Sequence, residues 1–213
     1  MLLFSRHFFV VEMSASKHIQ ETFQKEFKGE KDNLFNYKSI QRERLIEFRK
    51  EPKAVVRIER PTNLARARKL GFKAKKGFVV VRVRIRKGSG LHKRPKMGRR
   101  PKRMGVKKLT RRLNIQAMAE QRASRKFKNC EVLNSYSVGD DGKSHYFEVI
   151  LADTSAPEIV KDREVKWVSG KKQKGRAFRG LTGKGKKSRG LRKKGEGAEK
   201  VRPSLRAKKR QAK

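Results

Sequence analysis

The functional groups that stand out in this chain are the side chains of lysine and arginine. Their number and spacing suit them to bind phosphate oxygens. The chain has 213 residues, of which 61 are Lys or Arg and 20 are Asp or Glu, so the formal net charge is +41. The segment from Arg60 to Ala119 holds 22 Lys/Arg and no acid, and the segment from Lys166 to Lys213 holds 20 Lys/Arg and two acids. A solvated protein surface mixes both signs of charge, so these two segments predict a polyanionic partner.

Three arginines, Arg82, Arg84 and Arg86, form the most regular pattern among these basic residues. They alternate with the apolar residues of Val79–Ile85, which predicts a strand with one apolar face and one arginine face. Alternate residues of a strand stand roughly 7 Å apart, close to the separation of successive phosphates on one RNA strand. We expect the arginine face to follow a nucleic-acid backbone. The alternative is that the arginines only occupy the solvent-exposed face of a half-buried strand.

Residue types that support catalysis or metal binding form no comparable pattern. None of the four histidines has a partner at the spacing of a metal site. The single cysteine, Cys130, excludes an internal disulfide, and we expect it to be a small buried hydrophobe. The glycine and lysine pairs of Gly183–Lys186 lack the flanking strand and helix of a phosphate loop, and the acids of residues 131–164 resemble ordinary surface charges. We therefore expect no enzyme, no cofactor and no metal.

A membrane is the weaker candidate for the polyanion. No apolar run reaches the roughly 18 residues that a membrane-spanning helix requires. The apolar N-terminus from Met1 to Val11 has no basic region before it and no small-residue cleavage site, so it is not typical of a signal peptide. We interpret it as an extension ahead of a second possible start at Met13.

Helices and strands are expected around the basic segments, from hydrophobic periodicity and from capping residues. In chain order they are helices over residues 14–28 and 33–50, a strand over 54–60, a short helix capped by Thr62 and Gly71, a strand over 78–86, a helix from Asn114 to Lys128, and strands over 131–138 and 144–151 joined by a turn at 139–142.

Two basic stretches have no such periodicity. Residues 88–110 contain four glycines, two prolines and many Lys/Arg, so they cannot form a core of their own. We expect them to be an extended arm that RNA orders, in which Gly and Pro allow close approach to the backbone. Beyond Trp167 the chain becomes rich in Lys, Gly and Ser, which predicts a second arm followed by a simple basic tail after Gly195.

Four aromatic residues could stack on bases or belong to the core, and the sequence leaves both interpretations open. They are Phe72, Phe78, Trp167 and Phe178. No RNA-recognition-module or zinc-finger pattern accompanies them. We therefore expect recognition through RNA shape and phosphate position instead of a base code.

Several segments, in order, resemble one ribosomal protein family. ARARKLGFKAKKGFVVVRVRIRKG (residues 65–88) resembles its signature, and GRRPKRMGV (98–106), VLNSY (132–136), YFEVIL (146–151) and RGLTGKGKKSRGL (179–191) follow. The family is the archaeal and eukaryotic large-subunit family fifteen, of the eukaryote type. The resemblance runs from Leu34 to Leu191, with departures at Ala65, where the family usually has an acid, and at Ser137, where it usually has Trp.

This resemblance implies an α+β fold: a small four-stranded, largely antiparallel sheet with packed helices, plus an extended basic loop and a basic C-terminal arm. It implies a structural constituent of the large ribosomal subunit, in the cytoplasm, whose partners are large-subunit rRNA and neighbouring ribosomal proteins. We expect no membrane partner and no homo-oligomer. The expected divisions are an N-terminal extension with a short helix (1–33), a core domain carrying the RNA-binding loop 88–110 (34–165), and a basic arm and tail (166–213).

The residues expected to contact RNA are His92 and the Lys and Arg side chains of the motif-bearing basic segments. They are Arg66, Arg68, Lys69, Lys73, Lys75, Lys76, Arg82, Arg84, Arg86, Lys87, His92, Lys93, Arg94, Lys96, Arg99, Arg100, Lys102, Arg103, Lys107, Lys108, Arg176, Arg179, Lys184, Lys186, Lys187, Arg189 and Arg192. For the tail after Arg192 we expect only non-specific attraction.

A nucleic-acid chaperone or nucleoid-condensing protein is the alternative that charge alone would allow. Condensation needs only a basic tail. This chain instead keeps Gly, Pro and Arg in irregular, non-repeating order over residues 88–110. Such order is typical of a path through one fixed RNA shape, and it favours the structural ribosomal role.

Overall fold

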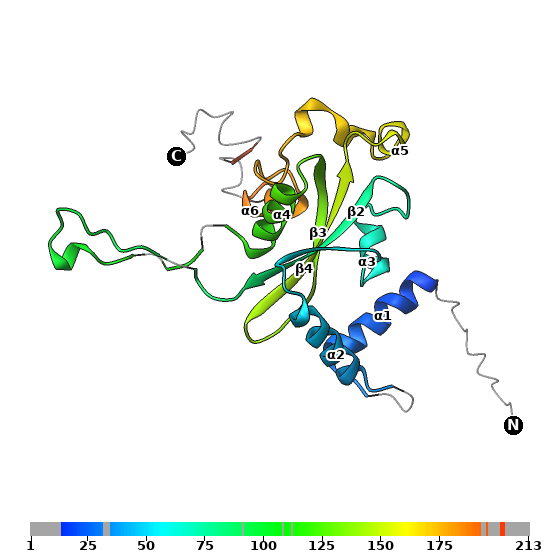
Figure 1. Ribbon diagram of the computed structural model, residues 1–213, viewed down its shortest axis with the longest axis horizontal. Coiled ribbons are helices and arrows are strands. Elements are labelled where there is room, and N and C mark those ends of the chain that lie inside the picture. The colour runs from blue at the N-terminus through cyan, green and yellow to red at the C-terminus, as the bar shows by residue number, and fades with distance from the viewer. Residues whose placement is uncertain are drawn as a thin grey trace, which may run out of the picture.

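The computed structural model describes residues 14–31, 35–90, 92–107, 109–111, 113–192, 195 and 201–202. They form an α+β domain in which a sheet lies between two layers of helices, and a long loop projects from one end (Figure 1). The expected extension over residues 1–12, Lys108 and the tail beyond Arg202 lie outside the described residues.

Four strands form the sheet, β1 (Val55–Ile58), β2 (Phe78–Arg86), β3 (Cys130–Asp140) and β4 (Ser144–Asp153). Their spatial order is β1-β2-β4-β3, and every neighbouring pair is antiparallel. The expected four-stranded antiparallel sheet is therefore confirmed. Strand β2, which carries Arg82, Arg84 and Arg86, thus lies inside the sheet, between β1 and β4.

Helix α4 (Ile115–Lys126) covers one face of the sheet. The alternating apolar residues of β2, with Val81 and Val83 fully buried, pack there with Ala119 and Ala123 of α4. The side chain of Asn114 accepts a hydrogen bond from the N–H of Gln116 and so begins this helix, as predicted. The apolar side of the expected arginine strand is thus confirmed.

The opposite face of the sheet is also covered, by α2 (Tyr37–Lys50), α3 (Leu64–Lys69) and α5 (Pro157–Lys161). Phe48 of α2 is 2% exposed and packs on Tyr146 of β4, with 5.3 Å between ring centroids. The sheet therefore has no solvent-exposed face over its centre, which contradicts the expectation of a wet arginine face on β2.

Helix α1 (Ala15–Lys28) packs outside this layer, against α2 and α3 (Figure 1). Gly29 ends it in the left-handed conformation, with φ at 69°, as the sequence predicts. Its buried Glu26 accepts hydrogen bonds from the guanidinium of Arg44, whose other contact is the ring of Phe23. These contacts fix α1 on the domain.

The residue that caps α3 differs from the predicted one. The side chain that caps α3 is Asn63, which accepts from the N–H of Arg66 at 2.8 Å; the predicted cap, Thr62, bonds to Glu148 instead.

Cys130 is buried, as expected, and burial raises the pKa of its thiol to about 11. Its thiol therefore stays protonated at neutral pH.

Over the described residues, no helix is long and apolar enough to cross a membrane. Within the same part of the chain, no three His, Cys, Asp or Glu side chains gather where they could hold a metal ion.

Candidate nucleic-acid interface

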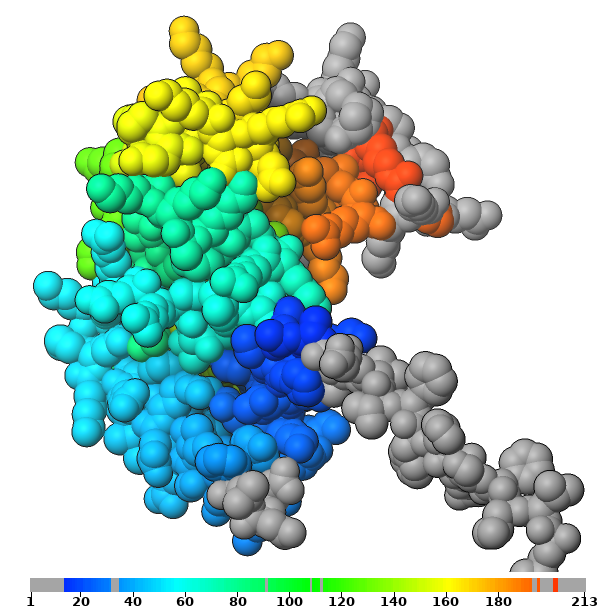
Figure 2. Space-filling view, turned by 90° about the vertical axis from the view of Figure 1, so that its right-hand side faces the viewer, coloured from blue at the N-terminus to red at the C-terminus, as the bar shows by residue number. Residues whose placement is uncertain are grey.

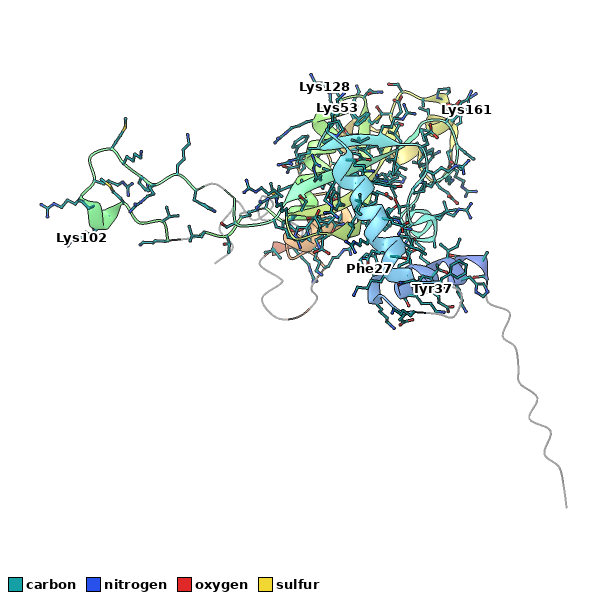
Figure 3. All side chains as sticks on the ribbon, turned by 60° about the horizontal axis from the view of Figure 1, so that its bottom comes forward. Phe27, Tyr37, Lys53, Lys102, Lys128 and Lys161 are labelled. Atoms are coloured by element: carbon teal, nitrogen blue, oxygen red, sulfur yellow. The ribbon has the colours of Figure 1, made fainter. Side chains whose placement is uncertain are left out.

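The loop over residues 88–107 is the most prominent basic feature of the described chain. It projects from the sheet, with a single short 3-10 turn, η1 (Pro101–Arg103), near its far end (Figure 1). In Figure 3 the side chain of Lys102 lies at that end, far from the domain that carries Lys53, Lys128 and Lys161. Met97 is 95% exposed, so the loop has no apolar core of its own.

Arg111 holds the two ends of this loop together. Its Nε donates to the carbonyl of Gly88 at 2.8 Å and its Nη2 to the carbonyl of Arg86 at 2.9 Å. Within the loop, His92 Nε2 lies 3.1 Å from the carbonyl oxygen of Ser89, and Arg94 Nε makes a longer contact of 3.4 Å with the carbonyl of Met104. The base of the loop is therefore fixed, while its basic side chains remain free to meet phosphates.

A groove of about 1210 Å³ lies where the loop meets α4. His92, Lys93 and Lys107 line it from the loop, and Arg122 and Arg125 line it from the helix. These two arginines are not among the residues expected from the sequence to contact RNA. Their signal was present, since they lie three residues apart on the exposed side of a helix whose other side carries Ala119 and Ala123.

Arg82 is not available on the surface, which corrects its assignment to a phosphate-binding face. Its side chain is 14% exposed, its Nη1 donates to Glu51 at 2.7 Å, and its guanidinium lies 3.8 Å from the ring centroid of Phe48. The physical reason is α2, which covers this side of the central strand. Arg84 is also partly covered, with long contacts to two backbone carbonyls, and Arg86 alone of the three is exposed.

Glu148 is the buried acid that completes this internal cluster. It is fully buried and accepts hydrogen bonds from the N–H of Thr62 at 3.0 Å and from the hydroxyls of Thr62 and Tyr136. Arg82 Nη2 lies 3.8 Å from its Oε1. Burial, and next the charge of Glu148, raise the pKa of Tyr136 well above its ordinary range, so the phenol remains a donor. The interpretation of this acid as ordinary surface charge is wrong.

Arg176 is likewise an internal residue and not a surface contact. It is 7% exposed, its Nε donates to the carbonyl of Val132 at 3.0 Å, and its guanidinium lies 4.4 Å from the ring centroid of Trp167. Burial lowers the pKa of its guanidinium below the ordinary value. Arg176 therefore ties the chain after Trp167 to a backbone carbonyl of the edge strand β3.

Residues 166–192 fold against the domain, which differs from the expected extended arm. They form η2 (Lys166–Ser169), η3 (Lys171–Gln173) and α6 (Gly183–Ser188), and α6 lies beside α4 (Figure 1). Fully buried Glu120 of α4 accepts from the hydroxyl of Thr182 at 2.6 Å, and burial raises the pKa of this carboxyl. Glu120 of α4 therefore anchors this segment together with β3, where Glu131 accepts from the N–H groups of Gly175 and Arg176.

The remaining residues expected to contact RNA are either exposed on the surface or partly covered by the domain. Those on the surface are Arg66, Arg68, Lys69, Lys75, Lys76, Arg86, Lys93, Arg94, Lys96, Arg99, Arg100, Lys102, Arg103, Lys107, Arg179, Lys186, Lys187 and Arg192. Those partly covered are Lys73, Arg84, Lys87, His92, Lys184 and Arg189. Of these, Lys73 is paired with Asp162 at 2.8 Å and Lys87 with Asp140 at 2.6 Å. Within the described residues most of the exposed set lies on the loop, on α3 and the turn after it, and on α6 and its flanks.

A folded α+β domain that presents this much exposed positive charge belongs to the class of proteins that bind nucleic-acid backbone. The sequence profile of the family described as "Ribosomal L15" matches residues 14–208. The large ribosomal subunit protein eL15 of Haloarcula marismortui is 51% identical over 168 residues, which cover 79% of this chain and 85% of that protein. The chain belongs to the ribosomal protein L15e family, and the resemblance drawn from its motifs is confirmed.

Proposed function

We propose that this protein, a structural constituent of the large ribosomal subunit in the cytoplasm, stabilises rRNA by binding its phosphate backbone through the loop 88–107. The observation that carries the proposal is the geometry of this loop. Its base is held by Arg111, its basic side chains are exposed, and it buries no core of its own. Such a loop is stable only when an anionic partner surrounds it.

The proposed contacts differ from those expected from the sequence. They keep the exposed basic residues of the loop and of α6, and they add Arg122 and Arg125 in the groove at the base of the loop. Arg82 and Arg176 are left out, because their guanidinium groups already bind Glu51 and the carbonyl of Val132. Arg86, the exposed arginine of β2, remains a proposed contact.

The proposed mechanism is electrostatic and geometric. Each lysine or arginine that meets a phosphate releases counterions, so many modest contacts add up to tight binding that weakens as salt rises. A fixed loop base makes these contacts possible only for an RNA of matching shape, because the base sets the direction in which the loop leaves the domain. The protein then acts as a spacer between rRNA segments, without catalysis and as a single copy.

A competition experiment separates this function from nucleic-acid condensation. The full chain is bound to labelled large-subunit rRNA, and unlabelled rRNA or unlabelled duplex DNA of equal phosphate concentration is added. We expect rRNA to displace the label at a concentration at least about tenfold lower than DNA, because the loop fits a shape and not only a charge. Equal competition by duplex DNA would instead support a condensing protein.

A further inference from the structure

A second pocket lies on the domain away from the loop, where the turn after α3, η2 and α6 come together. Its volume is about 460 Å³, within the range of roughly 300–1,000 Å³ typical of small-molecule sites. The residues that matter here are Arg68, Asn134, Trp167, Lys186 and Arg192. Figure 2 shows the segments that carry most of the lining, coloured cyan-green, yellow and orange, meeting on one face of the molecule.

Trp167 is the aromatic wall of this pocket. Its side chain is 45% exposed, although its neighbours Val165 and Val168 are 6% and 1% exposed. The buried guanidinium of Arg176 lies 4.4 Å from the centroid of its ring and fixes the orientation of the indole. An exposed indole held by a buried cation is a rigid stacking surface, and a base can stack on such a surface whatever its sequence.

Positive charge borders this aromatic wall. Arg68, Lys186 and Arg192 are exposed, and no hydrogen bond or ion pair engages their side chains among the described residues. Glu164 also lines the pocket, and it shares Lys73, at 2.8 Å, with Asp162. The pocket therefore combines an aromatic surface with an excess of positive charge, the combination that single-stranded nucleic acid requires.

Gly183 keeps two polar groups of the pocket close together. A Cβ at this position would lie 3.1 Å from Arg192 Nη2 and 3.2 Å from Asn134 Oδ1. Asn134 Oδ1 accepts from the N–H of Ser135 at 3.1 Å, which leaves its amide NH₂ as a donor at the pocket. A side chain at 183 would require the end of Arg192 or the amide of Asn134 to shift by a few tenths of an ångström.

We propose that this pocket holds one unpaired nucleotide of rRNA, with its base stacked on Trp167 and its phosphate at Lys186 and Arg192. The inference rests on the proposed function and deepens it, because it adds a single-nucleotide site to a protein otherwise expected to bind backbone alone. An unpaired base is the part of an RNA that can leave its stack and enter a protein pocket. Duplex RNA presents no such base.

Tryptophan fluorescence tests the site directly, because Trp167 is the single tryptophan of the chain. The full chain is titrated with deproteinised large-subunit rRNA, and separately with a blunt-ended RNA duplex. We expect rRNA to quench the emission of Trp167 as it binds, and the duplex to bind without quenching. Saturation by rRNA without quenching, or equal quenching by the duplex, would overturn the nucleotide site.

Two variants at this position add an affinity measurement. Trp167→Ala is expected to weaken rRNA binding by about tenfold or more, whereas Trp167→Phe, which keeps a ring, stays within about threefold of the parent. Phe35→Ala is the matched control, since Phe35 is 57% exposed on the N-terminal side of α2, and we expect no change. Thermal unfolding of each variant shows whether the loss of contact with Arg176 has loosened the fold.

The outcomes separate the nucleotide site from the proposed function. If the parent chain binds rRNA tightly and Trp167→Ala binds equally well, the pocket plays no part while backbone binding through the loop stands. If the parent chain does not prefer rRNA over duplex DNA, the proposed function fails and the nucleotide site fails with it.

Discussion

Replacing seven basic side chains of the loop by glutamine is expected to lower the affinity for large-subunit rRNA by at least about a hundredfold at moderate salt. Each lost phosphate contact also reduces the slope of log affinity against log salt by roughly 0.7–0.9, so the seven together should remove about 5 to 6 from that slope. Filter binding over a series of salt concentrations measures both quantities. The seven residues are Lys93, Arg94, Lys96, Arg99, Arg100, Lys102 and Arg103.

The fold should survive this change, because these side chains are exposed and pack on no core residue. We expect an unchanged urea midpoint. The matched control replaces seven exposed lysines of the domain by glutamine and should cost far less affinity, even though it removes the same charge. These lysines are Lys17, Lys38, Lys50, Lys53, Lys128, Lys143 and Lys161. Equal losses in the two variants would mean that charge alone, and not the loop, determines binding.

Glu148→Ala is expected to lower the free energy of unfolding by about 3–5 kcal/mol, the cost of breaking a buried charged network. Glu148 is fully buried, and its loss leaves Thr62 and Tyr136 without their acceptor and the partly buried Arg82 without the carboxylate 3.8 Å from its Nη2. Urea denaturation followed by circular dichroism measures the change.

Glu158→Ala provides the control for this substitution, since Glu158 is exposed on α5 and should change stability by less than about 0.5 kcal/mol. A loss below about 1 kcal/mol for Glu148→Ala would contradict the role given to the cluster. The same cluster explains why Arg82→Ser should destabilise the domain, whereas Arg86→Ser should leave it folded and weaken only RNA binding.

The sheet, α4 and the projecting loop were predictable because their signals are local. Alternation over Val79–Ile85 and the helical spacing from Ile115 to Phe127 report directly which side of each element is apolar. The loop was predictable for the opposite reason, since residues 88–110 have no periodicity and almost no apolar content. In each case the pattern of apolar residues within the segment is enough to predict its structure.

The structural roles of Arg82 and Arg176 were not predictable from the sequence, because their partners are distant in the chain. Arg82 meets Glu51, 31 residues away, and Arg176 meets the carbonyl of Val132, 44 residues away. Alternation shows that Arg82 points away from Val81, but it does not show that α2 covers that side. A basic residue in an acid-poor segment can therefore either bind RNA at the surface or bind other protein groups inside the domain.

The folding of residues 166–192 against the domain escaped prediction for a related reason. One anchor is a hydrogen bond between Thr182 and Glu120, 62 residues apart, and neither residue is unusual in its own segment. Composition alone made this stretch resemble an extended arm. Its contacts with α4 and β3 instead place Trp167 and α6 on a defined surface, which is what makes a nucleotide site there possible.

Lysine modification in intact large subunits tests the central claim, that the loop is surrounded by rRNA phosphates. Purified subunits and the free protein are treated with the same amine-reactive reagent, and the extent of modification at each lysine is compared by mass spectrometry. We predict that Lys93, Lys96, Lys102 and Lys107, all exposed in the free chain, react at least about tenfold more slowly in the subunit. Reaction of these four lysines at the same rate in both samples would contradict the account.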